Sequence, residues 1–124
     1  MTSERAHVLI VDDDPAIREI VATILRREHI TSDLATDGED AIAHLDANAY
    51  QAVVLDLLMP RVDGAAVIRH MRAKNILTPV IVISAVAEKD ELDPDIVRVT
   101  MKKPIELQDL RDVVGAVLRT TRNG

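Results

Sequence analysis

Five side chains that could act together in metal or phosphate chemistry stand directly after short apolar runs of the sequence. They are Asp12, Asp13, Asp56, Ser84 and Lys103. Three of them are carboxylates, which repel one another and raise each other's pKa unless a cation neutralises them. Mg²⁺ suits such a group because it prefers oxygen ligands and commonly takes one or two protein carboxylates together with a phosphate oxygen. The set therefore predicts a magnesium site to which a phosphoryl group could bind.

Asp56 is the member of this set that could react. With Mg²⁺ and Lys103 beside it, an incoming phosphoryl group would have its oxygens held by a metal, an ammonium and the Ser84 hydroxyl. A carboxylate in that position can act as a nucleophile toward phosphorus.

Some of these polar residues also have an ordinary structural interpretation. Asp14 is predicted to be only a helix N-cap. Asp12 and Asp13 are not both explained in this way, because adjacent acids point in different directions and only one can cap. Ser84 alone could equally satisfy the backbone groups of a turn.

The segments between these residues alternate between short apolar runs and amphipathic stretches. Five predicted strands lie at 8–11, 33–36, 52–55, 80–83 and 97–101, the second being the weakest. Four predicted helices have apolar residues at helical spacing within 17–25, 41–45, 67–71 and 107–118. Because the strands are apolar throughout, the pattern predicts an α/β fold of three layers, with helices on both faces of a parallel sheet. Ligands bind such sheets beyond the carboxyl ends of the strands, which is where the five polar residues stand.

The composition narrows the classes of function. The chain has 124 residues, 48% of them hydrophobic and 29% charged, which fits one domain. Tyr50 is the only aromatic residue and the formal net charge is −6, so neither base stacking nor a basic surface for nucleic acid is expected. The absence of cysteine excludes thiolate catalysis. No apolar stretch is long enough to span a membrane, and we expect a cytoplasmic domain without membrane contact.

Four separated motifs resemble the response-regulator receiver domain of bacterial two-component systems. They lie at 8–15, at 54–60 with Asp63 and Gly64, at 83–85 and at 103–104. The similarity runs from about Val8 to Leu118 with the motifs in the same order and spacing. It implies a flavodoxin-like (βα)5 fold with a five-stranded parallel sheet of order 2-1-3-4-5. We expect residues 1–119 to form the domain and 120–124 to be a tail or the start of a linker.

By this resemblance, Asp56 is the phosphoacceptor, and its phosphoryl group would come from a sensor histidine kinase, a phosphotransfer protein or a small phosphodonor. Asp13, Asp56 and the backbone carbonyl of Leu58 would bind Mg²⁺ directly, while Asp12 would act mainly through water. The resemblance thus implies a signalling switch with Mg²⁺ as its cofactor, rather than an enzyme with a separate substrate.

The resemblance also assigns roles to the residues after the last two strands. Ser84 and Lys103 would hold phosphoryl oxygens during the reaction, and the peptide bond between Lys103 and Pro104 would be cis. The phosphorylated form would then act on a downstream effector or an output domain. Contact of this domain with nucleic acid is not expected.

Two features depart from the family pattern. Relatives usually carry Tyr or Phe three residues before the site lysine, a ring that follows the movement of the Ser84 position, but this chain has Thr100. The segment between Ser84 and Lys103 is short and lacks a helical apolar stripe, so the helix expected there is short or irregular. We therefore expect weak coupling through Thr100. Instead, phosphorylation should order residues 86–95, whose five acids are offset only by Lys89.

Two other functions remain open at this point. A phosphohydrolase could use an aspartyl-phosphate intermediate, but such enzymes generally have a second acid two residues after the nucleophile, where this chain has Leu58. A degenerate receiver could act only as a protein-binding module, although the intact acids, Ser84 and Lys103 disfavour it. The sequence also leaves open whether the domain stands alone or belongs to a longer regulator.

Overall fold

The computed structural model describes residues 7–85 and 92–123 of the chain. Five strands form one sheet: β1 (His7–Val11), β2 (Thr31–Ala35), β3 (Ala52–Asp56), β4 (Val80–Ser84) and β5 (Val97–Lys102). Their order is β2-β1-β3-β4-β5, and every neighbouring pair is parallel. The predicted fold class and strand order are confirmed. The weakest predicted strand, 33–36, begins two residues earlier than expected, at Thr31.

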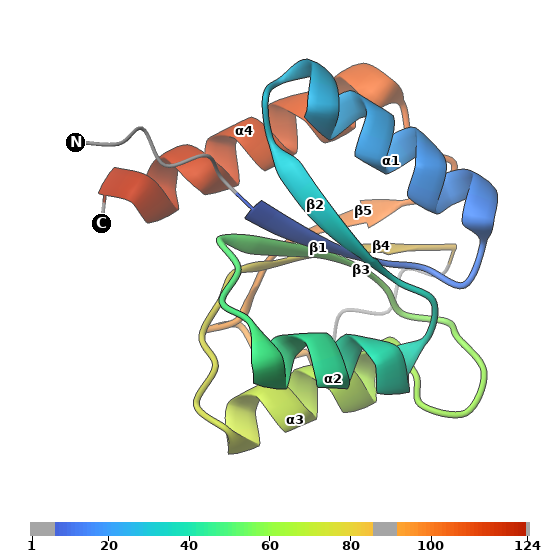
Figure 1. Cartoon of the computed structure of the whole chain (residues 1–124), viewed down its shortest axis with the longest axis vertical. Coiled ribbons are helices and arrows are strands. Elements are labelled where there is room, and N and C mark those ends of the chain that lie inside the picture. Colours follow the sequence, from blue (N-terminus) through green and yellow to red (C-terminus); the bar gives the residue numbers. More distant parts are fainter. Residues whose placement is uncertain (1–6, 86–91, 124) are drawn as a thin grey trace.

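Helices cover both faces of this sheet. In the described part of the chain they are α1 (Pro15–Arg27), α2 (Gly38–Ala47), α3 (Gly64–Ala73) and α4 (Leu107–Asn123). Figure 1 shows α1 and α4 on one face and α2 and α3 on the other, which gives the three predicted layers. None of the helices in 7–85 and 92–123 is long and apolar enough to cross a membrane. Because α4 runs to Asn123, residues 120–123 continue the last helix, and the domain limits stay a prediction.

The central strands are apolar on both sides because both of their faces are covered. In β3, Val53 and Leu55 belong to the core under α2 and α3, whereas Ala52 and Val54 belong to the core under α1 and α4. Every residue of β3 and β4 is buried. This double burial carries the last residue of β3, Asp56, into the interior, where its exposed fraction is 3%.

Aspartates begin the helices that start at the carboxyl edge of the sheet. The N-caps of α1, α2 and α3 are Asp14, Asp37 and Asp63, and each side chain accepts a hydrogen bond from a backbone N–H of the first turn. The prediction that Asp14 caps a helix is confirmed, since its carboxylate accepts from Ala16 N at 2.9 Å. Of the three acids at 12–14, Asp14 thus caps a helix, Asp12 is buried at the sheet edge, and Asp13 is exposed.

The connection from β4 to β5 contains no helix within the residues that the structure describes, and 94–96 form a turn. Residues 86–91, on which most of the expected short or irregular helix falls, lie outside the described residues. Arg72 of α3 donates to both carboxylate oxygens of Asp93, at 2.6 and 2.8 Å, and to Asp95 Oδ2 at 2.7 Å. The expectation that only Lys89 offsets these acids is therefore wrong for Asp93 and Asp95. The guanidinium of Arg72 lowers the pKa of Asp93 accordingly.

Tyr50 ties the first three strands together near their amino ends. Its hydroxyl donates to Asp33 Oδ2 at 2.6 Å, and its ring stacks on His7 with centroids 5.4 Å apart. His7 Nε2 also lies 3.2 Å from the same Asp33 oxygen. Burial and the Asp33 carboxylate raise the pKa of Tyr50, so the phenol stays protonated. This cluster lies at the edge of the sheet opposite the ends that carry Asp12 and Asp56.

Replacement of Gly64 should destabilise the fold because the glycine lies against the backbone that follows β3. A Cβ at Gly64 would lie 2.6 Å from the Asp56 carbonyl oxygen and 2.7 Å from Leu57 Cα. We expect Gly64→Ala to lower the free energy of unfolding by about 1–3 kcal/mol, measured by urea denaturation. Gly115→Ala is the matched control, because a Cβ there meets only Arg119 Nη1 at 3.3 Å. It should be neutral or stabilising by up to about 1 kcal/mol, and equal effects at the two positions would contradict this reasoning.

Candidate functional site

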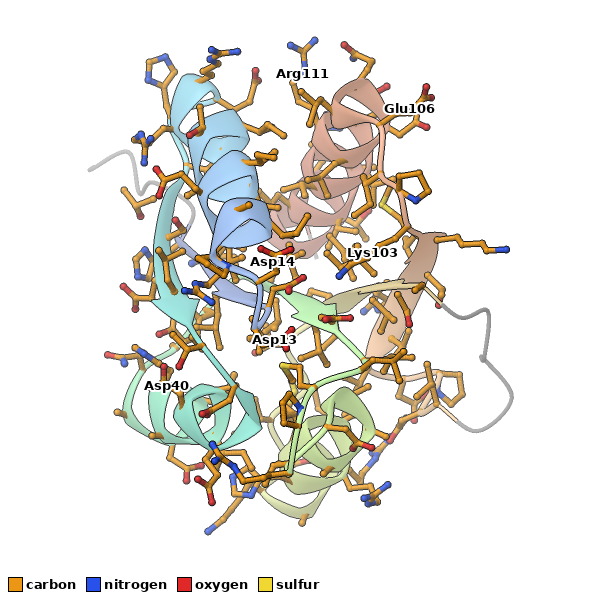
Figure 2. All side chains as sticks on the ribbon, turned by 90° about the vertical axis from the view of Figure 1, so that its right-hand side faces the viewer. Asp13, Asp14, Asp40, Lys103, Glu106 and Arg111 are labelled. Carbon is orange, nitrogen blue, oxygen red and sulfur yellow. The ribbon has the colours of Figure 1, made fainter. Side chains whose placement is uncertain are left out.

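The carboxyl ends of β1 and β3 form the point where the order of strands reverses. From β1 the chain continues to β2 on one side of the sheet, whereas β3 and the strands after it lie on the other side. Val11 pairs with Leu55, so the next residues of the two strands, Asp12 and Asp56, are neighbours. Figure 2 looks onto this edge, with α1 and α4 above it and α2 and α3 below. Such a reversal leaves a crevice in which α/β proteins bind ligands.

Three carboxylates meet in this crevice. One oxygen each from Asp12, Asp13 and Asp56 lies within 4.8 Å of the others. Asp12 is fully buried and Asp56 is 3% exposed, while Asp13 lies at the surface. The group is therefore open to solvent on one side and closed on the other. Its oxygen-only donors, with one exposed carboxylate, fit a divalent cation such as Mg²⁺.

Lys103 supplies the positive charge that faces these acids. Its Nζ lies 3.2 Å from Asp12 Oδ2 and 3.4 Å from Asp56 Oδ2. The backbone N–H of Lys103 donates to the Ser84 carbonyl at 2.8 Å, which fixes the lysine at the end of the sheet. Its peptide bond to Pro104 is cis, as the resemblance implied. Burial lowers the pKa of Lys103, but the contacts with Asp12 and Asp56 outweigh it and raise the pKa overall, so the ammonium persists.

Among the residues that the structure describes, the carboxylates at this edge outnumber the ammonium that contacts them, since Lys103 pairs with Asp12 and Asp56 while Asp13 is the third acid. Burial, and then the neighbouring Asp12, raise the pKa of Asp56 above its usual value of 3.8. Lys103 and the backbone N–H of Leu58, which donates to Asp56 Oδ1 at 3.3 Å, oppose that rise without cancelling it. The Asp56 carboxylate is thus poorly stabilised in the protein without a cation, and a cation in the crevice would relieve its repulsion.

Asp12 is the most firmly held of the acids. Its Oδ1 accepts from the backbone N–H of Asp14 at 2.9 Å, and its Oδ2 accepts from Lys103. Its backbone carbonyl accepts from Arg18 Nη1 at 2.7 Å. The sequence reasoning did not find Arg18. A signal was present, because a long basic side chain one turn into a helix can reach back to the strand end before it.

The remaining predicted residues differ in their distance from the crevice. Ser84 ends β4, beside the strand that ends at Asp56, and it is fully buried. The backbone of Leu58 contacts Asp56, but its side chain is 54% exposed. Thr100 lies within β5 opposite Val82, two residues before the strand end, and is half-buried. The structure therefore brings Ser84 and Leu58 to the site edge and leaves Thr100 beneath it, while their roles stay predictions.

Comparison with known families agrees with this geometry. The family model of the response regulator receiver domain matches residues 8–115. The chain belongs to this family. Apart from His7, the matched range includes the five strands, and it covers the whole acidic crevice. Members of this family act in signalling.

Curated relatives of this receiver domain are bacterial regulators. The response regulator MprA of Mycobacterium ulcerans is 32% identical over 121 residues, covering 93% of this chain and 51% of the relative. The transcriptional regulatory protein TrcR of Mycobacterium tuberculosis is 32% identical over 118 residues, covering 90% of this chain and 45% of the relative. The receiver thus spans about half the length of these relatives.

Solved structures share its architecture. The receiver domain of the Francisella response regulator 1452 superposes with a TM-score of 0.87 and 29% identity, covering 94% of this chain and 99% of that one. The response regulator TrrA of Thermotoga maritima, solved in complex with Mg²⁺ and BeF, gives a TM-score of 0.81 and 27% identity, covering 90% and 98% of the two chains.

The raised pKa of Asp56 predicts a pH-dependent stability. The folded protein holds the Asp56 proton more tightly than the unfolded chain, so the ionised carboxylate destabilises the fold above that raised pKa. At pH 7 without Mg²⁺, Asp56→Asn should have a higher free energy of unfolding than the wild type in urea denaturation, by on the order of 1 kcal/mol. This advantage should shrink as the pH falls through the raised pKa toward 3.8. Asp112→Asn, at an exposed acid, is the control. A less stable Asp56→Asn at pH 7 would refute the interpretation.

Proposed function

We propose that this receiver is a phosphoacceptor of a two-component phosphorelay and that Asp56 takes up the phosphoryl group. The observation that carries the proposal is a buried carboxylate at the sheet edge, with Lys103 Nζ 3.4 Å from its Oδ2 and two further acids beside it. The donor would be a sensor histidine kinase, a phosphotransfer protein or a small acyl phosphate. The cytoplasmic location expected from the sequence stays a prediction.

The residues of the crevice would have separate roles in this transfer, as the nucleophile and as ligands of Mg²⁺. A carboxylate oxygen of Asp56 attacks the phosphorus, and the bond from phosphorus to the donor atom breaks with its electron pair leaving on the donor. Mg²⁺ would be held by Asp13, Asp56 and the backbone carbonyl of Leu58, with Asp12 acting through water, and when bound it would neutralise charge on the phosphoryl oxygens. Because Asp56 is 3% exposed, its carboxylate is poorly hydrated and needs little desolvation before it attacks.

Lys103 and Ser84 would hold the transferred group. The ammonium of Lys103 already faces Asp56, so it can bind a phosphoryl oxygen without crossing the site. Ser84 would donate its hydroxyl to another phosphoryl oxygen, and its small movement is the proposed start of the switch. Thr100, opposite Val82 in β5, has no ring that could follow the movement of Ser84, which supports a route through Ser84 rather than through position 100.

A phosphohydrolase fits the site less well. Leu58 stands where an acid or base would assist water, and its side chain is apolar and 54% exposed. The transcriptional regulatory protein TrcR and the response regulator MprA are about twice as long as this chain, so we propose that the whole protein passes the signal to a further domain. Direct contact of the receiver itself with nucleic acid is not part of the proposal.

Phosphorylation should be specific to Asp56 and should require a divalent cation. We expect intact-mass spectrometry to show one phosphoryl group on the wild type after incubation with acetyl phosphate and Mg²⁺. Asp56→Ala and wild type with EDTA should both lose at least about nine tenths of the signal, because nucleophile and cation are then absent. Asp112→Ala, at an exposed acid of α4, is the control and should be labelled normally. Equal labelling of Asp56→Ala would sink the assignment.

An apolar groove beside the site supports docking of a protein donor. It has a volume of about 410 Å³ and is lined by Ile17, Ile20, Val21, Lys103, Pro104, Ile105, Leu107 and Leu110. Lys103 lines this groove and also reaches Asp56, so groove and phosphoacceptor site are continuous. Ile20 and Leu107 are 44% and 54% exposed and both line this one groove, so they belong to a contiguous apolar surface of the kind that binds partners. A donor that delivers a phosphohistidine to Asp56 would cover this groove.

Disruption of the groove should separate the two kinds of donor. Ile20→Glu should slow phosphotransfer from the cognate histidine kinase by at least about tenfold, because a charge would be buried in the docked complex. The rate with acetyl phosphate, which needs no docking surface, should not change. Leu77→Glu is the matched control, since Leu77 is 49% exposed but lies before β4, at the opposite edge of the sheet. Rapid quench measurements with both donors test this, and parallel losses with both would contradict docking at the groove.

A further inference from the structure

Arg18 of α1 reaches back to the backbone of the acidic segment. Its Nη1 donates to the Asp12 carbonyl oxygen at 2.7 Å, and its backbone N–H donates to the Asp14 carbonyl at 3.1 Å. Neither contact is with a carboxylate oxygen. The half-buried guanidinium lies beside three acids, but its hydrogen bond goes to a main-chain carbonyl and not to a carboxylate.

The carbonyl that Arg18 holds belongs to the peptide between Asp12 and Asp13. The two flanking peptides are also held, because the Asp12 N–H of the preceding peptide donates to the Ala35 carbonyl at 3.3 Å and the Asp14 N–H of the following peptide donates to the Asp12 carboxylate at 2.9 Å. Fixing the plane of this peptide fixes the direction in which Asp13 leaves the backbone. Asp13 is the exposed member of the acidic group, so its direction is not set by burial in the core.

Repulsion would otherwise move Asp13 away from the other acids. Its carboxylate oxygen lies within 4.8 Å of oxygens of Asp12 and Asp56, and Lys103 contacts only the latter two. A surface carboxylate that is free to rotate relaxes such repulsion by turning outward, which lowers its readiness to bind a cation. Arg18 can limit this movement through the backbone, because its guanidinium stays charged and holds the Asp12 carbonyl next to the main chain from which Asp13 projects.

We propose that Arg18 is a positioning residue that preorganises Asp13 for the divalent cation by holding the Asp12 carbonyl. This inference rests on the proposed function, since it takes Asp13 as a magnesium ligand. Ligand-orienting partners of this kind typically change metal affinity by about tenfold or more. The proposal predicts the direction in which the affinity for the cation changes when Arg18 is removed. If Arg18 acted through its charge alone, its removal would strengthen cation binding; if it positions Asp13, its removal weakens binding.

The test is a Mg²⁺ titration of the full chain followed by NMR, with urea denaturation to show that each variant is folded. Arg18→Met keeps the apolar stem and removes the donor, and it should bind Mg²⁺ about tenfold more weakly than the wild type. Arg18→Leu, which also lacks a donor, serves the same purpose if the first variant does not fold. Arg26→Met is the matched control, because the Arg26 side chain lies on the same helix, is 63% exposed and, within 7–85 and 92–123, has polar contacts only with Glu19, at 3.9 Å, and Thr23, at 3.2 Å. Its affinity should equal that of the wild type.

A double-mutant cycle with Asp13 isolates the mechanism. In an Asp13→Ala background, Arg18→Met should change Mg²⁺ affinity by less than about twofold, because the ligand it positions is gone. Unchanged or tighter binding by Arg18→Met alone, or an undiminished loss in the Asp13→Ala background, would overturn the proposal. A wild-type chain that binds no Mg²⁺ would instead overturn the proposed function, so the two failures are distinguishable.

Discussion

The burial of Asp12 and Asp56 side by side is the constraint on which the rest of the structure depends. Two carboxylates at 0% and 3% exposure repel each other strongly unless a cation reaches both. Lys103 does so from the end of β5, two strands away from β3 in the sheet. Lys103 reaches these acids only if β3, β4 and β5 pair in the observed register. The hydrogen bond from the Lys103 N–H to the Ser84 carbonyl continues that pairing to the end of the sheet.

Much of the fold and of the site could be predicted because both depend on patterns that run along the chain. An apolar run followed by an acid predicts a buried strand and a polar group at its carboxyl end, and parallel strands bring those ends together. The bounds of β2 were less accurate because this edge strand begins with Thr31 and Ser32, which lack the apolar character of the central strands.

Contacts made by long polar side chains could not be predicted in the same way. Arg72 binds Asp93 from 21 positions away along the chain, and nothing in the local sequence of the acidic segment indicates such a partner. Arg18 lies only six positions from Asp12, but the helical pattern indicates only that it is a polar residue outside the apolar stripe and not what its side chain contacts. Such contacts depend on which helices lie over which strand ends, and this is known only once the sheet has assembled.

The environment of Tyr50 determines what the intrinsic fluorescence of this protein reports. Tyr50 is the only Tyr, Trp or Phe of the sequence, so it alone would give near-ultraviolet absorption and fluorescence. Its phenol is bound to the Asp33 carboxylate and its ring lies on His7, two neighbours that quench tyrosine emission. Fluorescence should therefore brighten when the strands separate and stay nearly silent to events at the opposite edge of the sheet. The chain carries a built-in reporter of its unfolding that does not report on its acidic crevice.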